Sequence, residues 1–120
     1  MKITKLYPSL AVKDPTEQLN FFKDAGYKII HENKDVLEKG SIETTLEADN
    51  GQRIDIISAS KFEKEKHAIR MNVDDFDEAL ERFDKNHFNI ILGPQVTDSY
   101  KICVLESDID TYIVLYQHLK

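Results

Sequence analysis

The sequence predicts an α+β fold made of two consecutive βαβββ modules. Three observations support this prediction: an internal repeat, period-two alternation of apolar residues in the predicted strands, and a helix-start pattern after the first strand of each copy. The chain has 120 residues, a length that suits one domain. We therefore expect a single domain over 1–120, with one module at 1–60 and the other at 61–120.

The repeat is found by sliding the chain along itself. An offset of 61 residues aligns Val12 with Val73 and Asp14 with Asp75. The same offset keeps apolar residues in register over the following stretch: Leu19 with Leu80, Phe22 with Phe83, Tyr27 with Phe88, and Ile29 with Ile90. Further along, the offset becomes 59 and gives these pairs: Leu46 with Leu105, Ile54 with Ile113, and Ile56 with Leu115. A middle loop that is two residues shorter in the second copy explains the change.

Module one begins with a predicted strand over 4–12, in which Leu10 and Val12 share one face. A helix is expected next, because Asp14 and Glu17 have capping-box spacing, Pro15 suits the first helical position and Gly26 suits the end. Three further strands are predicted at 27–31, 42–48 and 53–58, with a hairpin turn at 49–51.

Module two repeats the order. A strand is predicted at 67–73, and Asp75 with Glu78 should cap the second helix. The remaining strands are predicted at 88–92, 101–105 and 111–117, with a turn at 108–110. Gly93-Pro94 is expected to interrupt the chain after the second strand of this module.

Composition narrows the classes of function. The chain holds 16 Lys and Arg against 22 Asp and Glu, so its net charge is −6. It has no cluster of Lys and Arg, which argues against a nucleic acid or an anionic membrane as partner. Six carboxylates fall on the second helix or at its start, where a solvated face explains them: Asp74, Asp75, Asp77, Glu78, Glu81 and Asp84. The single Cys103 excludes an internal disulfide and a cysteine-based zinc module, and we expect it to be a packed thiol. With neither a signal peptide nor a long apolar run, a cytoplasmic protein is expected.

The paired modules resemble the glyoxalase, bleomycin-resistance and extradiol-dioxygenase superfamily, also called vicinal oxygen chelate proteins. The resemblance covers nearly the whole chain and lies in these segments: 10–14, Phe21-Phe22, 25–27, 71–75, Leu80, Phe83, 108–110 and 113–117. It implies a cupped mixed sheet with helices outside and a ligand cavity inside. It also implies a homodimer, since short members of this superfamily commonly pair their modules between chains. Pairing within one chain stays open as well, because the linker at 59–66 suits either arrangement.

Metal-binding members of the superfamily place ligands on the first and last strands of each module. The resemblance assigns these positions to Tyr7, Asp55, Ala68 and Val114. Alanine and valine cannot bind a metal ion, so no metal and no cofactor is expected. His67 beside Ala68 would supply an imidazole only if the strand register slipped by one residue, which would turn every side chain to the other face.

Strand parity then predicts which residues line the cavity of such a fold. The expected binding residues are Tyr7, Ser9, Arg53, Asp55, Arg70, Asn72, Tyr112 and Tyr116. They suit a small molecule with a flat apolar part and a few polar groups. Asp55 is the one carboxylate placed there, and Arg70 is expected to pair either with Asp55 or with an anionic group of a ligand.

Four functions stay open at this point. The sequence favours a metal-free binding protein that sequesters a drug or metabolite, because the ligand positions are lost. The alternatives are a scaffold or regulatory dimer with a vestigial pocket, and a metal-dependent lyase or dioxygenase. An enzyme without a metal, with Tyr7 or Asp55 as the base, also stays open.

Overall fold

Two βαβββ modules follow one another in the computed structural model, which describes residues 1–119. The first module comprises β1 (Ile3–Val12), α1 (Thr16–Asp24), β2 (Lys28–Lys34), β3 (Ile42–Glu47) and β4 (Arg53–Ser58). The second comprises β5 (Lys66–Val73), α2 (Phe76–Lys85), β6 (Asn89–Val96), β7 (Tyr100–Glu106) and β8 (Tyr112–His118). The predicted α+β fold class is confirmed. Over 1–119, no helix is long and apolar enough to cross a membrane.

The chain divides into two compact units. The N-terminal unit is Tyr7–His67, and the C-terminal unit combines Met1–Leu6 with the residues from Ala68 onward. The first residues of β1 therefore belong to the C-terminal unit and its last six to the N-terminal unit.

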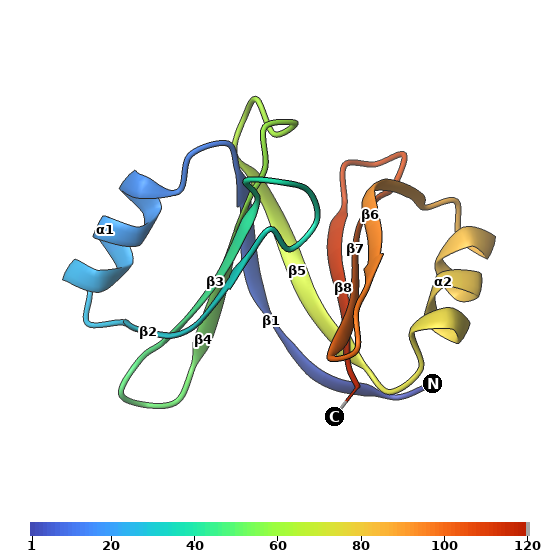
Figure 1. Cartoon of the computed structure of the whole chain (residues 1–120), viewed down its shortest axis with the longest axis horizontal. Helices are drawn as coiled ribbons and strands as arrows, with labels where there is room; N and C mark the ends of the chain where they lie inside the picture. Colours follow the sequence, from blue (N-terminus) through green and yellow to red (C-terminus); the bar gives the residue numbers. More distant parts are fainter. Residues whose placement is uncertain (120) are drawn as a thin grey trace. The chain divides into compact units, whose positions relative to one another are not determined.

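In the N-terminal unit the strand order is β2-β3-β4-β1, and α1 lies over one face of this sheet (Figure 1). β1 pairs with β4 in parallel, from Ser9 opposite Asp55 to Val12 opposite Ser58, and the other pairs are antiparallel. The core under α1 holds Val12, Leu46, Ile54 and Ile56, with Leu10, Leu19, Phe22 and Tyr27 packed against it. Alternate residues of β1 and β4 therefore face the helix, as the period of a strand requires.

In the C-terminal unit the order is β5-β8-β7-β6, with β5 and β8 parallel and α2 over one face (Figure 1). Its core contains Val73, Phe76, Ala79, Cys103, Leu105, Ile113 and Leu115. Cys103 is fully buried among these side chains, and burial raises the pKa of its thiol to about 12.

The sequence repeat is a structural repeat. Phe22 meets Tyr27 edge to face at 5.4 Å between ring centroids, and the aligned pair Phe83 and Phe88 does the same at 5.0 Å. The turn after β3 closes with Ala48 N–H bonded to the Gln52 carbonyl, and the equivalent turn after β7 with Ser107 N–H bonded to the Thr111 carbonyl, both at 2.9 Å. The offsets therefore match equivalent positions in the two modules.

Two local predictions are wrong. Gly93-Pro94 does not interrupt the chain: β6 continues through this cis peptide to Val96, with register shifts against β7. Proline is tolerated there because β6 pairs on one side only, at the edge of the sheet. Asp14 does not form the expected capping box with Glu17, because its Oδ1 accepts hydrogen bonds from the Thr16 N–H at 3.0 Å and from the Thr16 hydroxyl at 2.6 Å.

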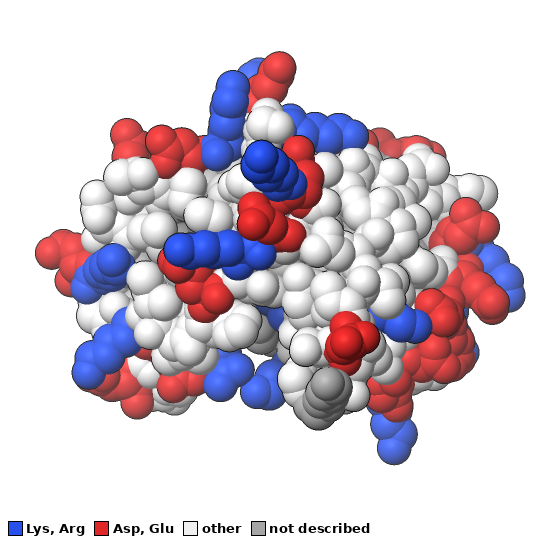
Figure 2. Space-filling view, viewed as in Figure 1, with Lys and Arg blue, Asp and Glu red and all other residues white. Residues whose placement is uncertain are grey.

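The second helix starts as predicted. Asp75 is its N-cap, and the Asp75 Oδ1 accepts a hydrogen bond from the Glu78 N–H at 3.0 Å. Figure 2 shows acidic side chains gathered over α2, and five of the six carboxylates are exposed, while Glu78 is half-buried. These charges therefore lie on a solvated helix surface.

Candidate functional site

The face of the C-terminal sheet opposite α2 carries four of the predicted binding residues. On β5, Met71 and Val73 pack toward the helix, so Arg70 and Asn72 point the other way. On β8, Ile113 and Leu115 pack toward the helix, which leaves Tyr112 and Tyr116 on the same face as Arg70. Period-two alternation therefore brings these side chains to one surface.

Arg70 is the centre of this surface. Arg70 is only 4% exposed, and its Nε donates a hydrogen bond to Asn72 Oδ1 at 2.8 Å. The guanidinium carbon lies 4.1 Å from the centroid of the Tyr116 ring, within cation–π distance. The sheet thus holds a buried cation on an aromatic ring, in a fixed orientation.

Tyr100 on β7 extends the aromatic surface. Its ring stacks on Tyr116 with centroids 5.8 Å apart and planes inclined by 17°. Sequence reasoning missed Tyr100, because only the first and last strands of each module were examined for lining residues. The parity of β7 would have found it, since Ile102 pairs with Tyr116 and Tyr100 shares the face of Ile102.

Tyr112 is directed to a neighbour on β7. It is buried, and the Glu106 opposite it forms a hydrogen bond with its side chain that raises the pKa of Tyr112 to about 12. Near neutral pH the phenol therefore keeps its proton, so it acts as a hydrogen-bond donor and not as a base.

The face of the N-terminal sheet opposite α1 carries the other predicted residues. Ser9 and Asp55 are buried in register with each other, and Asp55 Oδ1 accepts a hydrogen bond from the Thr45 hydroxyl at 2.9 Å. Arg53 forms an ion pair across β3 and β4, with its Nε 2.9 Å from Glu47 Oε2. Tyr7 on β1 is half-buried.

A second carboxylate shares this face, so the expectation that Asp55 stands alone is wrong. Glu43 is fully buried. It lies on the same face of β3 as Thr45, opposite the face of Leu46. Its cross-strand partner is Ile57, two residues beyond Asp55. The parity of β3 could have revealed Glu43. The N-terminal sheet therefore presents two buried carboxylates on one face, in place of one.

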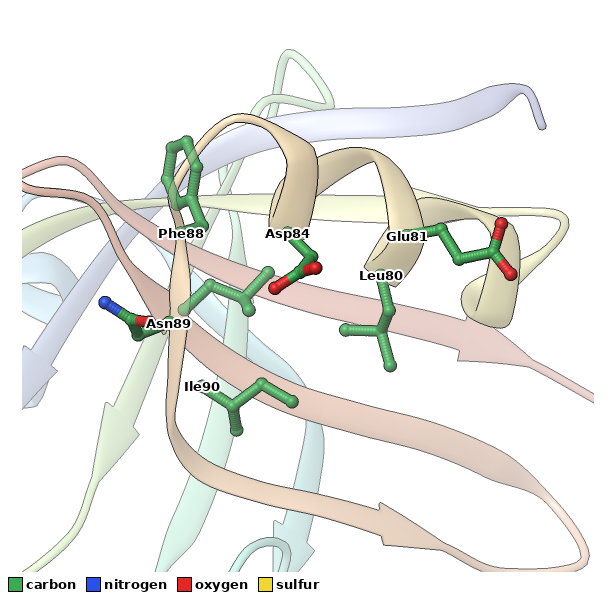
Figure 3. Close-up of a pocket in the computed structure, with 7 residues that line it drawn as sticks. Leu80, Glu81, Asp84, Phe88, Asn89 and Ile90 are labelled. Carbon is green, nitrogen blue, oxygen red and sulfur yellow. The ribbon is translucent and has the colours of Figure 1, made fainter.

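The grooves beside the helices use other residues. Beside α2 lies a groove of ≈ 380 Å³, lined by Leu80, Glu81, Asp84, Phe88, Asn89, Ile90 and Leu105. Figure 3 shows Leu80 and Asp84 extending from α2 on the side of Ile90, while the Glu81 carboxylate points away from them. None of the predicted binding residues lines this groove, so the predicted site and this groove are separate features.

Comparison with known proteins gives structural neighbours but no sequence relatives. No protein-family model and no curated protein matches the chain. Methylmalonyl-CoA epimerase from Mycobacterium tuberculosis is similar at a TM-score of 0.65 and 16% identity, covering 97% of this chain and 89% of that one. A glyoxalase/bleomycin resistance protein/dioxygenase superfamily member from Vibrio splendidus is similar at a TM-score of 0.60 and 16% identity, covering 94% and 97%.

A glyoxalase I variant from Zea mays is also similar, at a TM-score of 0.64 and 17% identity over 93% of this chain. Its own chain is longer, and this chain spans 42% of it. At 16–17% identity, these three similarities are similarities of the fold. This chain has the fold of the glyoxalase/bleomycin resistance protein/dioxygenase superfamily. The resemblance expected from the sequence is thereby confirmed at the level of the fold.

The residues at the superfamily's metal positions do not fit a divalent cation. In the C-terminal unit these positions are Ala68 and Val114, whose buried side chains are hydrocarbon. In the N-terminal unit they are Tyr7 and Asp55, and Asp55 already accepts the Thr45 hydrogen bond. Among residues 1–119 no three His, Cys, Asp or Glu side chains are grouped to hold a metal ion. The donor chemistry that a protein metal site requires is therefore missing at two of the four positions.

His67 does not replace the missing ligands. Its side chain is 83% exposed, and its Nε2 lies 3.8 Å from Glu65 Oε2. It shares strand parity with Met71 and Val73, which pack toward α2, rather than with Ala68 and Arg70. β5 therefore turns Ala68 and Arg70 away from α2, as the sequence-based assignment of its two faces assumed.

Proposed function

We propose that this protein binds a small organic molecule without a metal ion or other cofactor. The binding residues in this proposal are the eight expected from the sequence: Tyr7, Ser9, Arg53, Asp55, Arg70, Asn72, Tyr112 and Tyr116. The ligand has a flat apolar part and a polar or anionic group. The supporting observation is the buried Arg70 guanidinium, held over Tyr116 by its hydrogen bond to Asn72.

The chemistry of this surface suits such a ligand. A guanidinium is planar and presents its N–H donors in a fixed fork, which matches a carboxylate or phosphate group. The stacked rings of Tyr100 and Tyr116 provide aromatic surface for a flat molecule beside that fork. Neither interaction calls for an acid, a base or a metal ion, so binding is the activity that this geometry supports best.

A thermal-shift screen tests the proposal with planar aromatic carboxylates and their uncharged amides as probes. We expect a carboxylate to raise the melting temperature more than its amide does. Arg70→Met and Tyr116→Leu should each weaken binding of that probe by about tenfold or more. Arg82→Met is the matched control, because Arg82 is an exposed arginine on α2. Unchanged affinity in both Arg70→Met and Tyr116→Leu, each still folded by circular dichroism, would refute the proposal.

The absence of a metal ion is tested separately. Nickel, zinc, manganese and ferrous ions should leave the melting temperature unchanged, and elemental analysis of the purified protein should find no bound metal. A ligand at one hundred times its Kd stabilises a protein by about 2.7 kcal/mol, so specific metal binding would be easy to detect. Stabilisation of about 2 kcal/mol or more by any of these ions would contradict the proposal.

A homodimer and a cytoplasmic location complete the proposal. The dimer is inferred from the superfamily resemblance, in which short chains pair. Size-exclusion chromatography with light scattering tests it, and a monomer at micromolar concentration would refute it. The location agrees with a single cysteine that is reduced and buried, and imaging of a tagged protein in its native cell tests it.

A further inference from the structure

The N-terminal unit has a groove on the other side of its sheet, beside α1. Its volume is ≈ 470 Å³, and Leu10, Ile54 and Phe22 supply apolar surface. Phe21 is 65% exposed, and its ring meets Phe22 edge to face at 5.1 Å between centroids. Leu10 and Ile54 point toward α1, whereas Ser9 and Asp55 of the proposed function point away from it. The groove is therefore separate from the residues of the proposed function.

Polar groups also line the groove: Glu17, Gln18, Glu65 and His67. Gln18 Nε2 donates a hydrogen bond to Glu65 Oε1 at 2.9 Å. A carboxylate can accept a hydrogen bond from the amide NH₂ group but not from the amide oxygen, which has no proton. This bond therefore fixes the orientation of the amide and turns Gln18 Oε1 away from Glu65. Within the described part of the chain, that oxygen is buried without a hydrogen-bond partner. Its partial negative charge adds to that of the carboxylates that line the groove.

Glu17 stands beside Gln18 and also lines the groove. No hydrogen bond or ion pair of its carboxylate is found among residues 1–119. Glu65 adds a second carboxylate, with the exposed His67 imidazole 3.8 Å from it. The lining of the groove thus combines acceptors and negative charge with aromatic rings.

The second module shows what a carboxylate at this position binds. Glu78 is the residue equivalent to Glu17, and its Oε2 lies 2.8 Å from the N-terminal ammonium of Met1. Its Oε1 lies 3.1 Å from Arg82 Nη2, and these two cations lower the pKa of Glu78. The Met1 side chain packs against the core of the C-terminal unit. An ammonium group on an apolar chain therefore occupies the equivalent place in that unit.

The first module has neither of these cations. The residue equivalent to Arg82 is Phe21, and the residue equivalent to Gln18 is Ala79, so the repeat replaces a cation by an aromatic ring and a methyl group by an amide. We propose that the groove beside α1 binds a small organic ammonium ion. The ammonium pairs with the Glu17 carboxylate, and the apolar body lies against Phe21 and Phe22.

The probe for this proposal is 2-phenylethylammonium, which carries an aromatic body and a primary ammonium group. In a titration of ¹⁵N-labelled protein, we expect saturable shifts of the amide signals of α1 and of residues 65–67. The uncharged 2-phenylethanol should bind about tenfold more weakly or worse. No saturable shift in these segments at millimolar probe, or equal affinity for the alcohol, would overturn the proposal.

Two variants give the residue-level test. Phe21→Arg copies the Glu78–Arg82 pair of the second module and should weaken the probe by about tenfold or more, because the new guanidinium takes the Glu17 carboxylate. Glu17→Gln should weaken it similarly while the protein stays folded. Glu78→Gln, the matched control, should leave the affinity unchanged. Equal affinity in Phe21→Arg and the unmodified protein would refute the proposal, and Arg70→Met, which tests the proposed function, should not affect this probe.

Discussion

Two residues of the second module adopt positive φ where the first module has glycine. Gly26 follows α1 with φ +102°, and the equivalent residue after α2 is His87 with φ +66°. Gly51 in the turn after β3 has φ +86°, and its equivalent after β7 is Asp110 with φ +61°. A side chain in this region clashes with its own backbone, so the second module carries strain that the first avoids.

His87→Gly should therefore stabilise the protein. His87 sits one residue beyond the helix C-cap, where glycine is the preferred residue, and its imidazole is exposed. The gain is expected to be about 0.5–1 kcal/mol in the free energy of unfolding, measured by urea denaturation. His87→Ala is the control, since alanine suffers the same steric clash as histidine. A gain as large in His87→Ala would show that the backbone angle is not the cause.

Cys103 should make the stability fall at alkaline pH. Burial raises its thiol pKa to about 12 from an ordinary value of 9.0, so between these pH values the native state holds a proton that the unfolded chain has lost. Stability from this group is complete below about pH 9 and is lost as pH rises toward about 12, approaching about 1.4 kcal/mol per pH unit.

Cys103→Ala tests this by removing the titrating group. Urea midpoints at about pH 8 and about pH 10 should differ less for the variant than for the unmodified protein. Tyr112 also has a raised pKa, but its ordinary value is 10.0, so its effect begins only at the upper end of this range. An equal drop in both proteins would show that Cys103 does not control the alkaline loss.

At the scale of an element, α2 depends on its N-cap. Asp75→Ala removes the side chain that accepts the Glu78 N–H, and we expect a loss of about 1 kcal/mol in the free energy of unfolding. Asp77→Ala is the control, because it removes a carboxylate from the same turn and leaves the cap, losing only an exposed ion pair with Lys101 that contributes little. Their difference, measured by urea denaturation, isolates the cap, and equal losses would contradict this account.

Elements were predictable from sequence where local chemistry decides them. The alternation of Leu10 with Ala11, and of Met71 with Asn72, placed the strand faces correctly, because one face packs on a helix and the other does not. The path of β6 through Gly93-Pro94 was missed, since a proline in an edge strand looks in sequence like a proline that ends one. Asp14 was misassigned because its nearest donor, on Thr16, competed with the expected cap.

For the candidate site, the sequence likewise predicted which face each residue occupies but not which partners it has. Parity alone named Arg70, Asn72 and Tyr116, which do meet on one face. The partners of Arg53 and Tyr112 were not predictable, because Glu47 and Glu106 reach them across antiparallel pairs whose register depends on the turns. Glu43 stayed unnoticed for another reason: the face of β3 was not examined, although its parity places Glu43 beside Thr45, and the burial of this carboxylate follows from the strands on either side of β3.

At the scale of the whole molecule, the boundary between the two sequence modules does not coincide with the boundary between the two compact units. Each βαβββ module is about 60 residues, a size at which a single core is marginal. β1 is continuous from Ile3 to Val12, yet its first residues belong to the C-terminal unit and its last to the N-terminal unit. Melting either unit therefore frays a strand that the other unit uses. We predict that the chain, proposed above as one domain over 1–120, unfolds in one cooperative transition.

Tryptophan reporters at equivalent places test this cooperativity. The chain has no tryptophan, and Phe22 and Phe83 are aligned side chains that pack on the cores of the two units. Phe22→Trp and Phe83→Trp, each compared with circular dichroism of the same variant, should give fluorescence and dichroism midpoints that coincide within each protein. A reporter that changes at lower urea than the dichroism would show that its unit melts first. In that case the two modules would be independent folding units joined by β1, and the prediction of one domain would be wrong.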